Sequence, residues 1–161
     1  MRPGFGGLAL LFALTACMSE VQSPPITAAK ELVPLTGFGQ ATLVVDGEHE
    51  WPVMVADEPW LRSLGLMNVT DLGLWAGMVF EWDEPTLGGF WMKNTLIPLT
   101  VYWIDQQGAI VAIADMIPCP PEEQDCPSWH PGAPYVTALE VPAGTGEQLG
   151  ISSESVLTFR G

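Results

Sequence analysis

The chain has 161 residues, of which 48% are hydrophobic and 15% are charged, and its formal net charge is −14. This length indicates one domain with a core of its own, and excludes two full domains. The negative charge repels phosphate, which argues against DNA, RNA and anionic lipid as partners. Fifteen prolines and seventeen glycines indicate many short elements joined by turns.

The N-terminus has the form of a bacterial lipoprotein signal. Arg2 precedes an apolar stretch over residues 8–14, which is too short to span a bilayer as a mature helix. The stretch ends in "LTAC" at 14–17, which resembles a lipobox, the motif whose cysteine is lipidated and becomes residue one. We expect a lipoprotein signal peptide over 1–16 and a lipid on Cys17; an ordinary secretory signal with an incidental cysteine is the alternative.

The segment after Cys17 predicts a tether. Residues 17–36 carry three prolines and show neither a helical nor an alternating period, so we expect a flexible linker that lifts the domain off the membrane. The folded domain is then expected over 37–161. This arrangement places the protein in the cell envelope, on the extracytoplasmic side, with the membrane as a partner through the lipid on Cys17.

The domain itself reads as a series of short strands. "DG" at 46–47 and "QQG" at 106–108 are turn signals between apolar segments and predict two hairpins. Pro52 is expected to put its strand on an edge of the sheet or at a bulge. Short helices are expected after Asp57, with Pro59 in the first turn, and within 144–150. Strands are expected at 40–45, 50–55, 77–82 (ended by "DEP"), 89–93, 100–105, 109–115, 135–141 and 155–159.

This pattern predicts a mainly β (α+β) fold, a compact barrel- or sandwich-like domain of about seven or eight short strands with one or two short helices. Cys119 and Cys126 are expected to form a disulfide, the usual state of such a pair in an exported protein. A metal site formed by these cysteines with His130 and Asp125 is the alternative, but it lacks a clear fourth ligand. We expect neither a metal nor a cofactor.

The segment "GFWMKNTLIPLT" at 89–100 places a rare cation, Lys93, among apolar residues. An unpaired ammonium in a core is very costly, so we expect a stem buried along aromatic rings and an ammonium near a ring or a carboxylate. Glu140 is the first candidate partner, because strand alternation places it with Val136 and Ala138 on one face. Asp105 is the second candidate.

Several motifs together resemble the DUF192 family of small, often exported bacterial and archaeal proteins. These motifs occur in the family's order and spacing: "GLM" (65–67), "GMVFEW" (77–82), "FWMKNTLIPL" (90–99), "VYWID" (101–105) and "ALEVPAGTGEQLGI" (138–151). The resemblance implies a compact, mainly β fold with little helix, and it implies no activity. Two charges of the family pattern are missing here. Thr100 stands where the family usually has Asp, and Asn68-Val69-Thr70 supplies no Arg after "GLM".

Three functional classes remain open from the sequence. The favoured one is a non-enzymatic, membrane-tethered lipoprotein module that binds a small ligand or an envelope partner near Lys93. The second is a hydrolase or carbohydrate-acting enzyme that uses Lys93 and Glu140 as a polar pair. The third is a purely structural accessory domain whose polar corner only specifies the fold. The candidate ligand-binding residues are Trp91, Lys93, Asn94, Thr95 and Glu140.

Overall fold

The structure is a computed structural model that describes Met1 and residues 35–161. The expected signal peptide, Cys17 and the tether up to residue 34 lie outside the described residues. No helix within the described part is long and apolar enough to cross a membrane. The elements, in chain order, are β1 (Gly39–Val45), β2 (His49–Ala56), α1 (Pro59–Leu64), β3 (Gly77–Thr86), β4 (Phe90–Trp91), β5 (Leu99–Ile104), β6 (Ile110–Met116), β7 (Ser128–Trp129), β8 (Tyr135–Pro142), the 3-10 helix η1 (Glu147–Leu149) and β9 (Leu157–Arg160).

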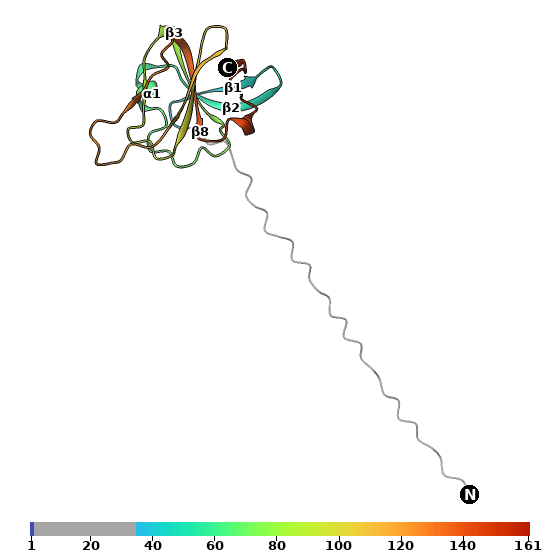
Figure 1. The fold of residues 1–161 in the computed structure, drawn as a ribbon. Helices are drawn as coiled ribbons and strands as arrows, with labels where there is room; N and C mark the ends of the chain where they lie inside the picture. The colour runs from blue at the N-terminus through green and yellow to red at the C-terminus, as the bar shows by residue number, and fades with distance from the viewer. Residues whose placement is uncertain (2–34) are drawn as a thin grey trace.

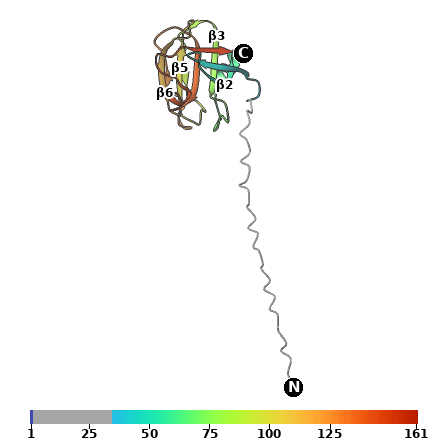
Figure 2. The ribbon, with the colours of Figure 1, turned by 90° about the vertical axis from the view of Figure 1, so that its right-hand side faces the viewer.

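Seven strands form one curled sheet in the order β6-β5-β8-β3-β2-β1-β9, and β4 pairs with β7 in a separate ribbon. Strands β2 and β3 are parallel, whereas the other pairs are antiparallel. The two edges of the sheet approach each other through a bridge between Ala109 and Val156. The sheet is therefore a half-closed barrel (Figures 1 and 2), and the expected fold class is confirmed.

The curled sheet buries a different hydrophobic cluster on each face. The inner cluster fills the barrel and includes Leu43, Val79 and Leu139, with η1 contributing Leu149. The outer cluster lies between the sheet and its cover of α1 and loops, and it includes Leu61 and Trp103. Figure 1 shows α1 beside the sheet, on the side away from the projecting β1–β2 hairpin. Because both faces are covered, all six residues of β5 are buried.

The structure differs from the expected elements in four places. Strand β3 continues through "DEP" to Thr86, with a register shift after Glu81, so the predicted end at residue 82 was wrong. Strand β4 covers Phe90–Trp91 instead of 89–93, because the chain turns at 92–95. Strand β7 was not predicted. Pro52 lies in a strand inside the sheet, but pairing of that strand with β3 begins only at Val53, which spares the missing N–H.

A glycine permits a close approach of two strands in the middle of the sheet. A Cβ atom added at Gly77 would lie 2.0 Å from the carbonyl oxygen of Glu140, which is backbone and has no room to move. Gly77 therefore allows β3 to pair with β8 at the level of Glu140.

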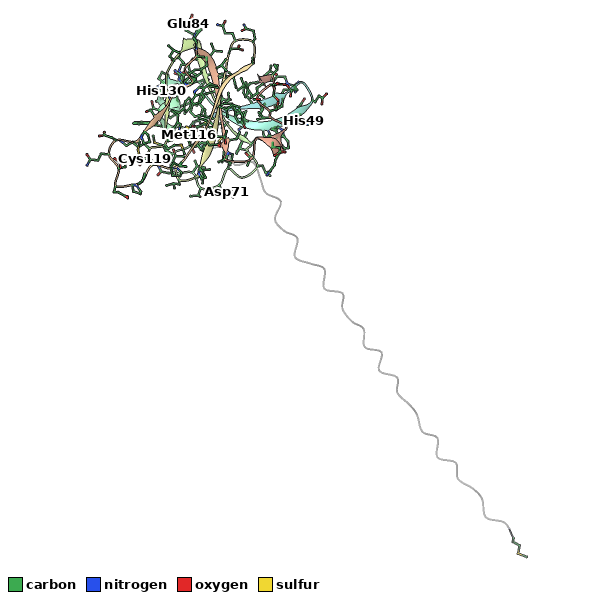
Figure 3. The ribbon with its side chains drawn as sticks, in the orientation of Figure 1. His49, Asp71, Glu84, Met116, Cys119 and His130 are labelled. Carbon is green, nitrogen blue, oxygen red and sulfur yellow. A yellow bond between two sulfur atoms is a disulfide. The ribbon has the colours of Figure 1, made fainter. Side chains whose placement is uncertain are left out.

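The disulfide between Cys119 and Cys126 is present, with a Cα–Cα distance of 5.7 Å, so this prediction is confirmed and the alternative metal site is wrong. The backbone N–H of Cys119 donates to the carbonyl of Met92 at 3.4 Å, which ties the cysteine loop to the turn after β4. Figure 3 places Cys119 and His130 on the side of the molecule where Figure 1 shows α1, and His49 on the other side.

Replacing both Cys119 and Cys126 by Ser is expected to lower the free energy of unfolding by about 2–3 kcal/mol, since the unfolded chain loses a loop constraint. Urea unfolding of the oxidised protein and of the double variant measures this difference. The reduced wild-type protein serves as the control and should match the variant. Equal stability of oxidised and reduced protein would contradict the expectation.

Candidate functional site

An open groove lies on the outer face of the sheet between α1 and β4; we call it the α1–β4 groove. Its volume is about 440 Å³. Its walls combine the helix surface with aromatic rings from β3 and β4. The residues that line it are Pro59, Arg62, Ser63, Phe80, Trp82, Gly89, Phe90 and Trp91.

A smaller cavity of about 30 Å³ adjoins this groove, with which it shares Arg62, Phe80 and Trp91 among its walls. We call it the Glu140 pocket. It lies between the end of α1, the segment after it and the turn that follows β4. The residues that line it are Arg62, Ser63, Leu64, Gly65, Leu66, Met67, Phe80, Phe90, Trp91, Thr95 and Glu140.

Glu140 supplies the buried carboxyl of this pocket. On β8 it lies between Met78 of β3 and Val101 of β5, both members of the outer cluster, so its side chain belongs to the outer face. The residue is only 4% exposed, and its carboxyl makes no hydrogen bond or ion pair with any residue the structure describes. Burial raises the pKa of Glu140 to about 8, because the charged form loses its hydration. The carboxyl is therefore mostly protonated at neutral pH.

Arg62 joins α1 to the sheet at the wall of the groove. Its Nη1 donates to the carbonyl oxygen of Glu81 at 2.7 Å and also to the carbonyl oxygen of Asp57. Its guanidinium carbon lies 5.2 Å from the centroid of the Trp82 ring, a cation–π distance. Trp82 in turn meets Phe90 edge-on at 6.2 Å between centroids. These contacts fix the aromatic wall before any ligand arrives.

The predicted environment of Lys93 was wrong in part. The side chain is exposed, and among the described residues it forms no ion pair with Glu140 or any other carboxylate. Its Nζ atom lies 5.4 Å from the centroid of the Trp91 ring, so the expected position over a ring is observed. Asp105, the second candidate partner, instead accepts hydrogen bonds from the backbone of its own turn. Lys93 reaches water because the chain leaves the strand after Trp91, so its ammonium keeps its hydration without a carboxylate.

The turn after Lys93 has a structural basis. Asn94 adopts φ 55°, a left-handed conformation that asparagine tolerates better than most residues. Its carbonyl accepts a hydrogen bond from the N–H of Asn68 at 2.8 Å, and Thr95 forms a bridge with Met67. The "GLM" and "KNT" motifs therefore lie side by side and form the floor beside the Glu140 pocket.

Thr100, which stands where the family usually has Asp, does not line the Glu140 pocket. Thr100 is buried on β5, and its hydroxyl donates to Oδ1 of Asp115 on the adjacent strand β6 at 2.6 Å. The hydroxyl is satisfied by this bond, so the replacement leaves no unpaired charge at that position.

The structure brings three of the five candidate site residues together. Trp91, Thr95 and Glu140 line the Glu140 pocket, whereas Lys93 and Asn94 are exposed and do not line it. Sequence reasoning missed Arg62 and Trp82. The signal for Arg62 was available, because it is one of five Lys and Arg residues in the chain and belongs to a predicted helix.

Other parts of the surface offer less chemistry. A hollow of about 550 Å³ lies between residues 70–75, 97–98 and 142–148, but its acidic residue, Asp71, is exposed. Among the described residues, no group of three or more His, Cys, Asp or Glu side chains is arranged to hold a metal ion. The Glu140 pocket and the α1–β4 groove therefore form the candidate site.

Comparisons with known proteins give a family and two structural neighbours. The DUF192 family profile, described as "Uncharacterized ACR", matches residues 41–159. A Sinorhizobium meliloti 1021 protein, provisionally described as a transcription regulator, is 26% identical, with a TM-score of 0.66, and the match covers 78% of this chain and 98% of that one. A Novosphingobium aromaticivorans DSM 12444 protein of unknown function is 28% identical, with a TM-score of 0.65 and coverages of 82% and 94%. A search of curated proteins found no match.

Replacing Glu140 by Gln is expected to stabilise the fold at alkaline pH by roughly 3–5 kcal/mol. The folded carboxyl, with a pKa of about 8, binds its proton more tightly than the unfolded carboxyl at 4.5. The free energy of unfolding of the wild type therefore falls as pH rises from the unfolded to the folded pKa. The Gln side chain does not ionise, so the variant should not lose stability in this way.

Urea unfolding across that pH range measures the effect. The difference in the free energy of unfolding between Glu140→Gln and wild type should shrink as the pH is lowered toward 4.5, the unfolded pKa. Glu122→Gln, in the exposed cysteine loop, is the control and should follow the wild-type curve. Parallel curves for Glu140→Gln and wild type would contradict the buried, unpaired carboxyl.

Proposed function

The chain belongs to the DUF192 family, and we propose that it is a membrane-tethered extracytoplasmic lipoprotein module that binds a small ligand in the α1–β4 groove. One observation carries the binding proposal, namely the buried, unpartnered carboxyl of Glu140 in a pocket that adjoins an open aromatic groove. Sites for small molecules are typically apolar clefts of about 300–1,000 Å³ with a few placed polar groups. The groove, at about 440 Å³, has this size, and four aromatic residues contribute to its lining.

The alternatives receive less support from the same geometry. An enzyme that uses Lys93 and Glu140 as a pair requires the two groups to meet, and they do not. A purely structural corner would be closed and fully paired, whereas this carboxyl faces a cavity. An envelope protein as the ligand would need a broad contact surface of about 800 Å² per partner. The feature that carries the present proposal is instead a confined pocket of about 30 Å³.

The proposal includes no nucleic acid and no cofactor. The description of the Sinorhizobium protein as a transcription regulator is not extended to this chain, because a net charge of −14 opposes binding to phosphate. The membrane is proposed as a partner through a lipid on Cys17. In this arrangement the groove faces the extracytoplasmic space and meets ligands there.

Replacing Cys17 by Ser is expected to release the protein from the membrane fraction or to leave the precursor unprocessed, since serine offers no sulfur for the lipid. Cell fractionation and the intact mass of the purified protein measure this. Cys119→Ser together with Cys126→Ser is the control and should leave membrane attachment unchanged. Retention and normal processing of Cys17→Ser would contradict the anchor.

Filling the groove is expected to abolish ligand binding without unfolding the protein. Ser63 is exposed on α1 and lines both cavities, so Ser63→Trp should obstruct them. A library of small metabolites is screened against the mature protein by NMR, and wild-type shifts are expected to gather at residues 62–67, 80–82, 89–95 and 140. Ser153→Trp, in the exposed turn before β9, is the matched control. Equal binding by both variants would contradict this site.

A further inference from the structure

The Glu140 pocket, which adjoins the α1–β4 groove, admits only a small substituent of a ligand. The Glu140 pocket has a volume of about 30 Å³, and its carboxyl has no partner among the residues described. One buried water needs about 10–15 Å³ by such a measure. The pocket therefore has room for a hydroxyl or hydroxymethyl group, and a ring must stay outside it.

An exposed indole stands at the mouth of this pocket. Trp91 lines both the pocket and the groove and is 47% exposed, whereas its strand neighbour Phe90 is buried. A large aromatic face next to a confined polar group suits a ligand with one apolar side and several polar edges. The C–H face of a sugar ring has this character.

The charges around the groove disfavour an ionic ligand. Lys93 lies over the Trp91 ring and Arg62 over the Trp82 ring, so a cationic ligand would meet a cation on each of two aromatic faces. An anionic ligand would approach a protein of net charge −14. A neutral, hydroxylated ligand meets neither penalty.

We propose that the α1–β4 groove recognises a neutral saccharide, with one sugar ring stacked on Trp91 and one hydroxyl of that sugar hydrogen-bonded to Glu140. The exposed side chain of Lys93, whose Nζ lies 5.4 Å from the centroid of the Trp91 ring, then leaves that ring for water. This inference rests on the proposed binding function and specifies its ligand class. A sugar hydroxyl both donates and accepts a hydrogen bond, as a protonated carboxyl also does.

The surroundings of Glu140 fit this role. Besides Glu140, Arg62 of α1 is the only charged residue that lines the pocket, and its Nη1 is engaged with backbone carbonyls. Strands β3 and β4 contribute Phe80, Phe90 and Trp91, and the turn after β4 contributes Thr95, none of which is charged. Burial raises the pKa of Glu140 to about 8, so the neutral form prevails at neutral pH.

The test uses the mature protein on an array of neutral mono- to tetrasaccharides of hexoses, pentoses and N-acetylhexosamines, followed by calorimetry of the best ligand. Trp91→Ala should weaken binding about tenfold, the upper range for loss of one aromatic contact. Glu140→Gln keeps a donor and an acceptor and should weaken binding less than Glu140→Leu, which keeps neither. Ser153→Trp should bind as wild type does.

Other outcomes separate the two proposals. One such outcome is that an organic ammonium such as choline binds instead of a saccharide. Its affinity should then increase about tenfold for each unit by which the pH is raised toward the Glu140 pKa, because binding releases one proton. Glu140→Gln and Glu140→Leu should lose that binding equally. This result, or a carboxylate ligand blocked by Ser63→Trp, would overturn the saccharide inference and leave the groove function standing. The absence of any ligand blocked by Ser63→Trp would overturn both.

Discussion

Burial of the central strands on both faces is the constraint on which the rest of the structure depends. Strand β5 is buried along its whole length, and its neighbour β8 is buried at most positions. A sheet buried on both faces needs a cover on each of them. The curl of the sheet supplies one by closing over the inner cluster. The outer face is covered piece by piece, by α1, the 66–75 segment and the β4–β7 ribbon. The α1–β4 groove lies where two of these pieces leave a gap, so the site follows from how the outer cover is assembled.

Local signals in the sequence predicted the strands joined by tight turns and much less of the outer cover. The hairpins at "DG" and "QQG" are encoded by neighbouring residues, and both were correctly placed. Strand β7 has two residues and exists only because it pairs with β4, about forty residues earlier in the chain. The end of β3 was misplaced for a related reason, since Thr86 pairs with Tyr135 of β8 in spite of the turn-forming "DEP". Pairing between distant segments overrode the local preference in both cases.

The sequence predicted those features of the candidate site that follow from the alternation of side chains along a strand. It missed the features that depend on which segments lie close together in three dimensions. Alternation correctly placed Glu140 on a buried face and identified a carboxyl that needs a partner. The same reasoning failed for Lys93, because a long side chain beside a turn can reach water. Arg62 and Glu140 are far apart in the sequence. Both line one pocket only because α1 packs on β3. Two polar residues that each need compensation are not, for that reason alone, each other's partner.

The lone carboxyl also bears on why the pocket exists. A glutamate that only fills space on the outer face costs stability whenever it ionises, and a leucine or a glutamine of similar size would avoid that cost. Several other polar groups of the described molecule do have partners. Thr100 donates to Asp115, and Asp46 accepts from Ser155 and from the N–H of Val156. Within the described residues, the Glu140 carboxyl, which faces a cavity, departs from this pattern, and so does the buried Nε1 of Trp103, which has no hydrogen-bond partner. Local inconsistencies of this kind are expected at functional sites, where the missing partner is supplied by a ligand.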